Sequence, residues 1–507
     1  MRKYLFLLVM LFSINLSATK YFSKNYLSTR PAGVNLPMQY TTWHTNLYRK
    51  PDAFYNGSIQ IVPFYQESNN KTELGKYFGF DWGASRGIEN IISVSPSDST
   101  KVFVSRKIIH SHDGTKNTLL ANYYMHPDQI VWGARFDYNQ DLDEILDGLY
   151  FRLSTPIVEV KNLVDLSVIG NDIQSELNGM AKEYSFLDYL SGNVENVVNT
   201  NNLQTNLKYA KLDSNRHSSS GFADVDVRVG WKFLAKRKIR SGLNLSLLIP
   251  TGKTPKAEWI FEPVHGNGHH WGVGAGLDLS LVLWRHDNNY MEFMIVADYK
   301  YLFQGIEKRT VGIFDPNPNL NSKTIIKGGQ YVLGAQNGQK GVFPLANVLT
   351  QDVKVTPASQ FDGIANLTFN FCNWILDLGY NLYFTENEQV SLKNPWENDK
   401  YAMAGIAYNT ANNFDTIYNA DNAHASVYDT TELVSGVSNV AIQDQYLDFG
   451  SITTPSVMTH KIYAGLGYQW NKYKYPAMLS IGASYEFASN NSSLENWSAW
   501  FKTGLSW

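Results

Sequence analysis

The residues best suited to catalysis lie in the stretch His217-Ser218-Ser219-Ser220-Gly221. His217 and Ser219 are two positions apart, so they share one face of a strand, and a histidine base beside a serine nucleophile can support hydrolysis. The sequence offers no identifiable polar partner that would orient His217. We therefore expect a polar loop at 214–221 that leads into a strand, and we assign no catalytic residue.

Metal and cofactor chemistry has little support in the sequence. His265, His269 and His270 lie in a glycine-rich stretch, but Glu262 is the only carboxylate near them at ligand spacing. The segment 385–455 is acidic, yet it lacks the ordered Asp, Asn and Gly spacing of a calcium loop. The sequence therefore predicts no metal ion and no cofactor.

Charged residues also recur at alternate positions of apolar segments, as Asp226 and Arg228 do between Val225, Val227 and Val229. A strand with lipid on one face and water on the other requires this alternation. The residues assigned to a water-facing lumen are Arg135, Asp137, Arg152, Asp226, Arg228, Lys232, Asp278, Glu292, Asp298, Lys300, Asp377, Lys461, Glu486 and Lys502. Since the two signs nearly balance, we expect weak ion selectivity, pairing across adjacent strands, or both.

Twelve segments that show the alternation can supply the strands that carry these charges. They are 58–65, 130–138, 149–159, 222–234, 241–250, 272–284, 290–303, 356–370, 374–384, 456–470, 477–487 and 496–507. About ten residues tilted by about 45° cross a bilayer. A single alternating strand would also fit a soluble sandwich, so the whole set carries the argument.

The connections between these segments alternate in length. Gaps such as 235–240 and 371–373 are short, whereas 66–129, 304–355 and 385–455 are long. Short periplasmic turns and long extracellular loops are typical of bacterial outer-membrane barrels. The sequence therefore predicts an all-β fold, a closed antiparallel transmembrane β-barrel of 12 strands, and the long loops 304–355 and 385–455 are candidates for a constriction or lid.

Two features of the loops leave alternatives open. Further strands near Lys76–Trp82 and Lys101–Ile108 would raise the number of strands to 14 and keep both chain ends periplasmic. The apolar stripe in Asp172–Leu190 predicts a helix, which we expect in a surface loop rather than as a cap or plug of the barrel.

The N-terminus predicts export. Arg2 and Lys3 precede an apolar run that ends at Leu16, and small residues follow, so we expect a signal peptide at 1–18 with Sec-type cleavage near Ala18. Residues 19–56 would form a periplasmic N-terminal segment or a short plug, and 57–507 the barrel. The chain would then reside in the cell outer membrane, in contact with lipid and lipopolysaccharide.

Composition excludes other classes. The formal net charge of −3 provides no basic surface for nucleic acid, and the aromatic content of 14% suits the aromatic girdles of a membrane barrel. After the leader, no apolar stretch approaches the ~18 residues of a spanning helix. The single cysteine, Cys372, excludes an internal disulfide framework.

The last segment alternates to the end of the chain, with Gly504, Leu505 and Trp507 at its close. This ending resembles the signal by which the barrel-assembly machinery of Gram-negative outer membranes recognises its clients, which implies that machinery as a partner through Trp507. Through its pattern, most of the mature chain resembles the porin-like class. The stretch from Leu243 to Lys253, with its Pro-Thr-Gly, resembles barrels associated with uptake of aromatic compounds, as does 148–157 less closely.

These patterns predict a porin-like channel for passive or weakly selective passage of small solutes. An outer-membrane hydrolase is the alternative, because the stretch from His217 to Gly221 is similar to the His-x-Ser-Asn-Gly of outer-membrane phospholipases, although Ser220 replaces the asparagine. A non-conducting surface or adhesion barrel is a third. Phospholipid cleavage that is lost in His217→Ala would indicate the hydrolase, and a lumen blocked by side chains would indicate the third.

Overall fold

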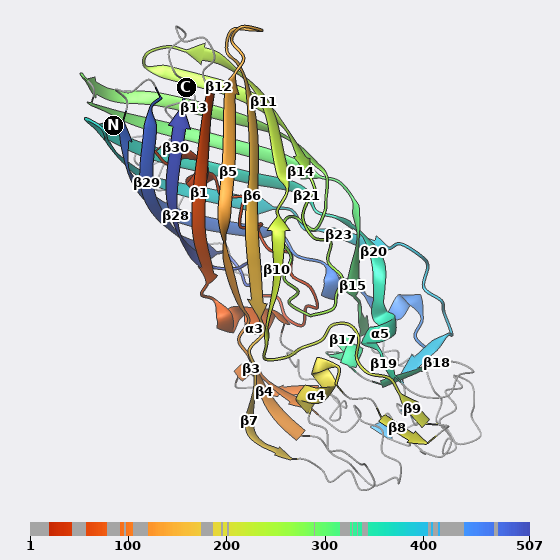
Figure 1. Cartoon of the computed structure of the whole chain (residues 1–507). Helices are drawn as coiled ribbons and strands as arrows, with labels where there is room; N and C mark the ends of the chain where they lie inside the picture. Colours follow the sequence, from red (N-terminus) through yellow and green to blue (C-terminus); the bar gives the residue numbers. More distant parts are fainter. Residues whose placement is uncertain are drawn as a thin grey trace, which may run out of the picture.

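The computed structural model is mostly β, with a long barrel and a smaller region of short elements beyond one of its ends (Figure 1). It describes residues 20–42, 57–78, 92–95, 98–104, 120–173, 186–193, 196–199, 202–287, 289–314, 325–326, 328–331, 333–336, 343–403, 407–408, 414–415, 441–470 and 475–507. The expected leader, 1–18, lies outside these residues.

Twelve antiparallel strands form the wall of the barrel. They are β1 (Gly57–Ser68), β5 (Asp128–Asp141), β6 (Leu149–Leu163), β11 (Val225–Ala235), β12 (Ile239–Ile249), β13 (Gly272–His286), β14 (Asn289–Leu302), β21 (Ala358–Phe371), β22 (Trp374–Thr385), β28 (Val457–Trp470), β29 (Ala477–Ala488) and β30 (Asn496–Ser506). Each pairs with the next, and β30 pairs with β1 from Ser58↔Ser506 to Ser68↔Asn496, which closes the barrel. The predicted closed barrel of 12 strands is confirmed.

The wall separates two solvents. In β12, Leu243, Leu245 and Leu247 are 51%, 71% and 40% exposed, whereas Asn244 and Ser246 between them are 4% and 9% exposed. The leucines point out of the barrel and the polar side chains point in, because successive side chains of a strand lie on opposite faces. An apolar exterior around a closed wall fits a hydrocarbon surround.

The two ends of the barrel differ. At the turn end, where β1 begins and β30 stops, the connections are short; at the loop end they are long and carry structure of their own (Figure 1). Within the described residues, no helix has both the length and the apolar character needed to cross a membrane.

One wall position is interrupted. The short strand β10 (Arg216–Phe222) pairs with the loop-end half of β6, and β11 pairs with the turn-end half. Ala223 and Asp224 separate β10 from β11, and Asp224 has a positive φ of 65°. Its carboxylate accepts hydrogen bonds from the amides of Gly252 (3.2 Å) and Asn267 (2.8 Å), which hold the break in place. The predicted strand 222–234 therefore corresponds to β11 preceded by this break.

The loop end contains several small sheets and short helices. Three sheets have three strands each: β15 (Gly305–Thr310), β20 (Thr350–Thr356) and β23 (Gln389–Leu392); β16 (Gly312–Phe314), β17 (Ile325–Ile326) and β27 (Leu447–Asp448); and β18 (Leu333–Gln336), β19 (Phe343–Pro344) and β24 (Tyr401–Met403). One sheet has four strands: β2 (Ile92–Ser95), β3 (Asp98–Val104), β4 (Leu120–Met125) and β7 (Leu166–Ile173). Two pairs complete the set: β8 (Asn196–Asn199) with β9 (Asn202–Gln204), and β25 (Ala407–Tyr408) with β26 (Phe414–Asp415). The helices are α3 (Lys71–Phe78), α4 (Phe186–Ser191), α5 (Ala346–Leu349), η2 (Gly329–Tyr331), η4 (Asp444–Tyr446) and η5 (Phe449–Ile452).

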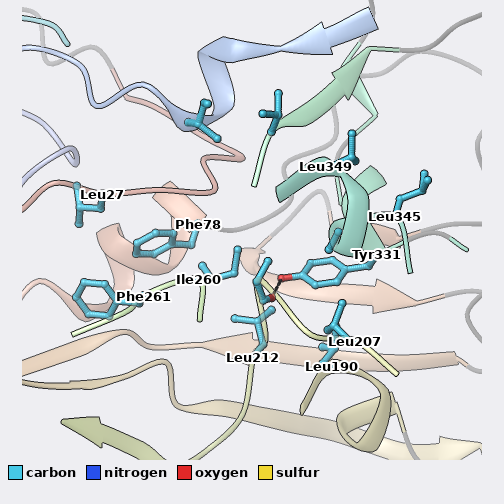
Figure 2. Packing of buried hydrophobic residues seen from close by; sticks show 14 of the residues in the cluster. Leu27, Phe78, Leu190, Leu207, Leu212, Ile260, Phe261, Tyr331, Leu345 and Leu349 are labelled. Atoms are coloured by element: carbon cyan, nitrogen blue, oxygen red, sulfur yellow. Dashed lines mark hydrogen bonds between the residues drawn. The ribbon is translucent and has the colours of Figure 1, made fainter. Parts of the chain in front are cut away.

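These elements share an apolar core. Figure 2 shows Phe78, Phe261 and Tyr331 among leucines from several loops, and Leu27 joins them from the N-terminal part of the chain. The hydroxyl of Tyr331 donates a hydrogen bond to the carbonyl oxygen of Ala210 (2.7 Å). Burying this apolar surface gives the loops a fixed arrangement above the barrel.

The two additional wall strands do not form. Residues 71–78 form helix α3 rather than the start of the strand expected at Lys76–Trp82, and β3, at the position of Lys101–Ile108, belongs to a separate sheet, so the alternative of 14 strands does not hold. Residues 79–82 and 105–108 lie outside the described residues. Of the helix expected in Asp172–Leu190, the part from Phe186 is helical, 172–173 end strand β7, and 174–185 lie outside the described residues. At 71–78 packing within the loop region outweighed the local strand periodicity.

Candidate functional site

Residues 20–42, here called the luminal segment, occupy the interior of the barrel. Near the loop end, the amide of Tyr21 donates to Asn491 Oδ1 (2.8 Å). Near the turn end, Gln469 Nε2 donates to the carbonyl oxygen of Thr42 (3.0 Å). The segment therefore extends along the length of the lumen, and any solute path must pass it.

The lower part of the luminal segment contains a one-turn helix, α2 (Leu36–Tyr40). Asn35 caps its start by accepting a hydrogen bond from the amide of Met38 (3.3 Å), and Pro37 lies in the first turn, where its missing N–H costs nothing. Leu36, Met38 and Tyr40 are buried against apolar residues of the wall. The cap and the proline thus fix the local shape of this part of the segment.

Arg30 ties the luminal segment to three strands. Its guanidinium contacts Asp362 of β21 (Nη2–Oδ2, 2.8 Å) and Glu486 of β29 (Nη1–Oε1, 3.0 Å). It also donates to Asn381 Oδ1 of β22 (3.1 Å) and lies 4.3 Å from the ring centre of Tyr383. The Arg30 side chain is only 8% exposed, so removing it would leave two buried carboxylates without this cation.

Lys502 of β30 holds the end of α2. Its ammonium donates to the carbonyl oxygens of Gln39 (3.1 Å) and Thr41 (2.7 Å), and the lysine is fully buried. Carbonyls at a helix C-terminus lack intrahelical partners and favour a cation. The amide of Thr42 then donates to Asp377 Oδ2 of β22 (2.5 Å). A cation, Lys502, thus binds Thr41, and an anion, Asp377, binds the next residue.

Tyr40 is fixed from two sides. Its hydroxyl donates to Asp278 Oδ1 of β13 (3.1 Å) and accepts from Arg152 Nη1 of β6 (2.6 Å). Beside it, Gln39 Nε2 donates to Asp137 Oδ1 of β5 (3.3 Å). The luminal segment is therefore bonded to charged residues of most sides of the wall.

The residues that the sequence assigned to the lumen all lie along this interior. All are buried except Lys232, which is part-buried. Many of them also form ion pairs within the wall: Arg135 with Asp137, Arg228 with Asp226 and Asp298, Lys300 with Asp226, Lys232 with Asp141, Arg240 with Glu292, and Lys461 with Glu486. The interior is thus a set of neutralised clusters rather than a field of one sign.

Two small cavities lie along the luminal segment, the first beside residues 28–31 and the second beside residues 33–36. One is lined by Glu307, Glu388 and Thr454 on the loop-end side, and the other by Asp226, Lys300 and Arg228, while Tyr383 borders both. Each holds about 40 Å³, room for about three water molecules. At this volume neither cavity would admit a solute much larger than water.

The two catalytic candidates have separate partners. His217 Nε2 bonds to Asp213 Oδ1 (2.8 Å), and its ring stacks on Trp259 at 3.7 Å. Ser219 Oγ bonds to His265 Nδ1 (2.8 Å). The structure therefore does not bring His217 to Ser219 as base and nucleophile.

The other two histidines of the glycine-rich stretch have unlike surroundings. His269 is exposed, whereas His270 is buried and uses Nδ1 toward the carbonyl oxygen of Phe303 and Nε2 toward Glu307 Oε1, each at 2.9 Å. Burial acts to lower the pKa of His270, but its hydrogen bond and attraction to Glu307 outweigh burial and raise that pKa. In the part of the chain that the structure describes, no three His, Cys, Asp or Glu side chains gather to hold a metal ion.

Four bonding residues of the luminal segment, Arg30, Gln39, Tyr40 and Thr42, were not predicted from the sequence. Their stretch lacks strand periodicity, so the sequence holds only an indirect signal for them. Inward-facing carboxylates need cations as partners once they are buried. Arg30 supplies one to both Asp362 and Glu486.

No family model and no curated protein matches the chain. Among solved structures, an outer membrane channel from Pseudomonas putida F1 aligns with 10% identity and a TM-score of 0.35, over 90% of this chain and 99% of that one. The toluene transporter TodX of Pseudomonas putida aligns with 12% identity and a TM-score of 0.33, over 96% and 97%. A Pseudomonas aeruginosa FadL homologue gives 7% and 0.25, over 97% and 98%. Likenesses this low carry no argument about function.

Proposed function

We propose that this chain is an outer-membrane channel for passive or weakly selective passage of small solutes, closed at rest by its luminal segment. The wall supports a membrane location, because it is closed and apolar outside, while its interior is charged. The interior supports weak selectivity, because its basic and acidic side chains neutralise one another in pairs.

The observation that carries the proposal is the bonding of residues 20–42 to the lumen. The segment contributes no strand to the wall, so the barrel can remain closed when the segment moves. Water or a polar solute can take over hydrogen bonds such as those of Thr42 and Gln39. A shift of the segment would join the two small cavities along it into a wider path.

A reversible crosslink tests this proposal. Thr42 Oγ1 and Ser480 Oγ lie 3.0 Å apart, so a Thr42→Cys, Ser480→Cys pair can form a disulfide between the segment and β29. Cys372, which is exposed, is replaced by Ser to avoid mispairing. Conductance across planar bilayers is expected to fall on oxidation and to return on reduction.

The matched control carries Thr42→Cys alone in the Cys372→Ser background and should conduct equally in both redox states. If the crosslinked pair conducts as well as the reduced pair, the segment does not close the path and the proposal fails.

Small aromatic compounds are the first solutes to test, because the stretch from Leu243 to Lys253 resembles aromatic-uptake barrels. Fractionation should recover the protein with the outer membrane.

A further inference from the structure

At the turn end, the β11–β12 turn and the end of β13 bring exposed basic side chains together. The turn carries Lys236, Arg237 and Lys238, and Arg285 lies near the end of β13, opposite Tyr290 of β14. The turn lies against β13, because the amide of Val282 donates to the carbonyl oxygen of Lys238 (2.9 Å). We call these four side chains the basic rim.

Within the described residues, none of the four side chains of the basic rim forms an ion pair. Asp287, two positions after Arg285, contacts His286 instead (3.4 Å). The guanidinium carbon of Arg285 lies 5.4 Å from the ring centre of Tyr290. Basic residues that face the lumen are paired instead: Lys232 of β11 with Asp141, and Arg240 of β12 with Glu292. Clustered like charges repel one another, so four free cations at one place favour an anionic ligand from outside.

Apolar side chains lie directly beside the basic rim on the outer wall. Phe233 is 45% exposed, Leu283 54% and Trp284 46%, and they precede the two turns by a few residues. Aromatic residues at strand ends lie at the level of lipid headgroups. A ligand that reaches both the cations and these side chains must therefore be amphipathic, with its charge at the membrane surface.

The wall is irregular at the same place. The pairing of β11 with β12 shifts between Trp231 and Leu234, and that of β13 with β14 shifts between Val282 and Trp284. Bulges bend a strand and redirect its side chains. These two irregularities lie on the strands on either side of β12, so the β11–β12 turn and Arg285 each follow a bulge.

We infer that the basic rim binds the phosphate headgroup of an anionic phospholipid in the leaflet at the turn end. Arg237 and Arg285 can each present two parallel N–H donors to phosphate oxygens, and the lysines add charge. The acyl chains would lie along Phe233, Leu283 and Trp284. An acidic turn with Asp143, Glu144 and Asp147 lies on the other side of β11, where Trp231 Nε1 donates to the carbonyl oxygen of Asp147 (3.0 Å). Its carboxylates repel a phosphate, so the site is limited to the β12–β13 side. Conduction is not required for this binding.

Native mass spectrometry of the full chain in a neutral detergent, with phosphatidylglycerol or phosphatidylcholine added, tests the inference. Wild type should retain phosphatidylglycerol preferentially. The triple variant Lys236→Gln, Arg237→Gln, Lys238→Gln should lose at least about tenfold in phosphatidylglycerol affinity, since each basic residue near a membrane surface contributes roughly fivefold. Phosphatidylcholine binding should not change.

The matched control removes three exposed lysines at the loop end, Lys208→Gln, Lys256→Gln and Lys354→Gln, with the same change in net charge. This control should still bind phosphatidylglycerol in preference to phosphatidylcholine. The variant Lys236→Arg, Lys238→Arg, which retains the charge, should do the same, and it also checks that the β11–β12 turn tolerates substitution. Equal loss in both triple variants, or no preference in wild type, would overturn the inference. Displacement of the lipid by excess inorganic phosphate would assign the site to free phosphate instead.

Discussion

Arg30 is the residue on which the closed lumen depends most directly. Arg30→Gln keeps a hydrogen-bonding side chain of similar length but leaves Asp362 and Glu486 without their shared cation. Breaking a buried pair in this way costs about 3 kcal/mol or more. We expect the cost to be relieved by release of the luminal segment, seen as higher bilayer conductance and faster proteolysis within residues 20–42.

Arg216→Gln is the control for that substitution. Arg216 pairs with Asp128 (2.7 Å), but its side chain is 30% exposed, and Lys71 also contacts Asp128 (3.3 Å). Its loss should cost below about 1 kcal/mol and leave conductance unchanged. If both variants behave alike, Arg30 has no special part in closure.

The pair of His270 and Glu307 predicts a pH dependence of the loop end. The pKa of His270 is raised above 6.5. Burial opposes ionisation of Glu307, but the charges of Arg309 and His270 outweigh burial and lower the pKa of Glu307 below 4.5. A raised histidine pKa gives stability that is complete below 6.5 and is lost as pH rises through the folded value. A lowered glutamate pKa gives stability that is complete above 4.5 and is lost as pH falls through the folded value.

Protection of the loop end should therefore be greatest between these limits and should fall on the alkaline side. Arg309 transmits the change inward, because it bonds to Glu307 (2.8 Å) and lies 3.6 Å from the ring centre of Tyr26 in the luminal segment. Hydrogen exchange of residues 303–310 measures the effect. His270→Gln should remove the alkaline loss, and an unchanged alkaline profile in this variant would assign the loss to another group.

Spacing in the sequence predicts which charged side chains face the lumen, but it does not predict their partners. The inner face of each strand follows from alternation, so charges such as Asp377 and Lys502 could be placed in the lumen from the sequence. Their partners could not, because pairs such as Lys502 with the carbonyl oxygen of Thr41 join positions far apart in the chain. Contacts of this kind depend on the folded path rather than on spacing.

At the scale of elements, three strand pairs place an aromatic ring over a glycine. Tyr150 lies opposite Gly230, Tyr463 opposite Gly379, and Trp500 opposite Gly482. A Cβ added at Gly379 would lie 2.2 Å from the Tyr463 ring. The ring can lie flat against the wall only where the opposite residue has no side chain, which is a known way to stabilise a glycine in a sheet.

Gly379→Ala should therefore displace Tyr463 and destabilise the barrel by about 1–3 kcal/mol in urea unfolding. Gly242→Ala, on β12, is the matched control, because its nearest neighbour is the carbonyl oxygen of Trp231 at 3.3 Å and no ring lies over it. Adding Tyr463→Ala to Gly379→Ala should remove the clash. A loss in Gly242→Ala as large as in Gly379→Ala would show that sheet entropy, not the ring, sets the cost.

The wall elements were predictable, and the loop elements were not. Each wall strand faces two solvents, so its sequence must alternate, and every predicted segment corresponds to a strand of the barrel. Segments such as 71–78 pack within the loop end, where Tyr77 and Phe78 are buried in a core of several loops. There the pattern reflects many neighbours at once and no longer identifies the element.

At the scale of the whole molecule, the seam between β1 and β30 completes the barrel. Gly57 and Trp507 exchange backbone hydrogen bonds of 3.2 and 3.0 Å, and the Trp507 ring lies near Tyr138 at 6.2 Å between centroids. Trp507→Ala should reduce the yield of folded barrel in the outer membrane, measured by heat-modifiable migration. Trp507→Phe, which keeps a terminal aromatic, should restore most of it; equal defects in both would exclude an aromatic requirement.

The path of the luminal segment reverses the usual orientation of a barrel's first residues. Because residues 20–42 cross the lumen before β1 begins, Lys20 reaches Glu73 beyond the loop end (3.2 Å), on the side opposite to Gly57 and Trp507. Short turns predict a periplasmic turn end, and with that orientation a peptide epitope placed just before Lys20 is expected on the cell surface. Antibody labelling of intact cells would read the position of this segment directly, and a drop in labelling would report its withdrawal.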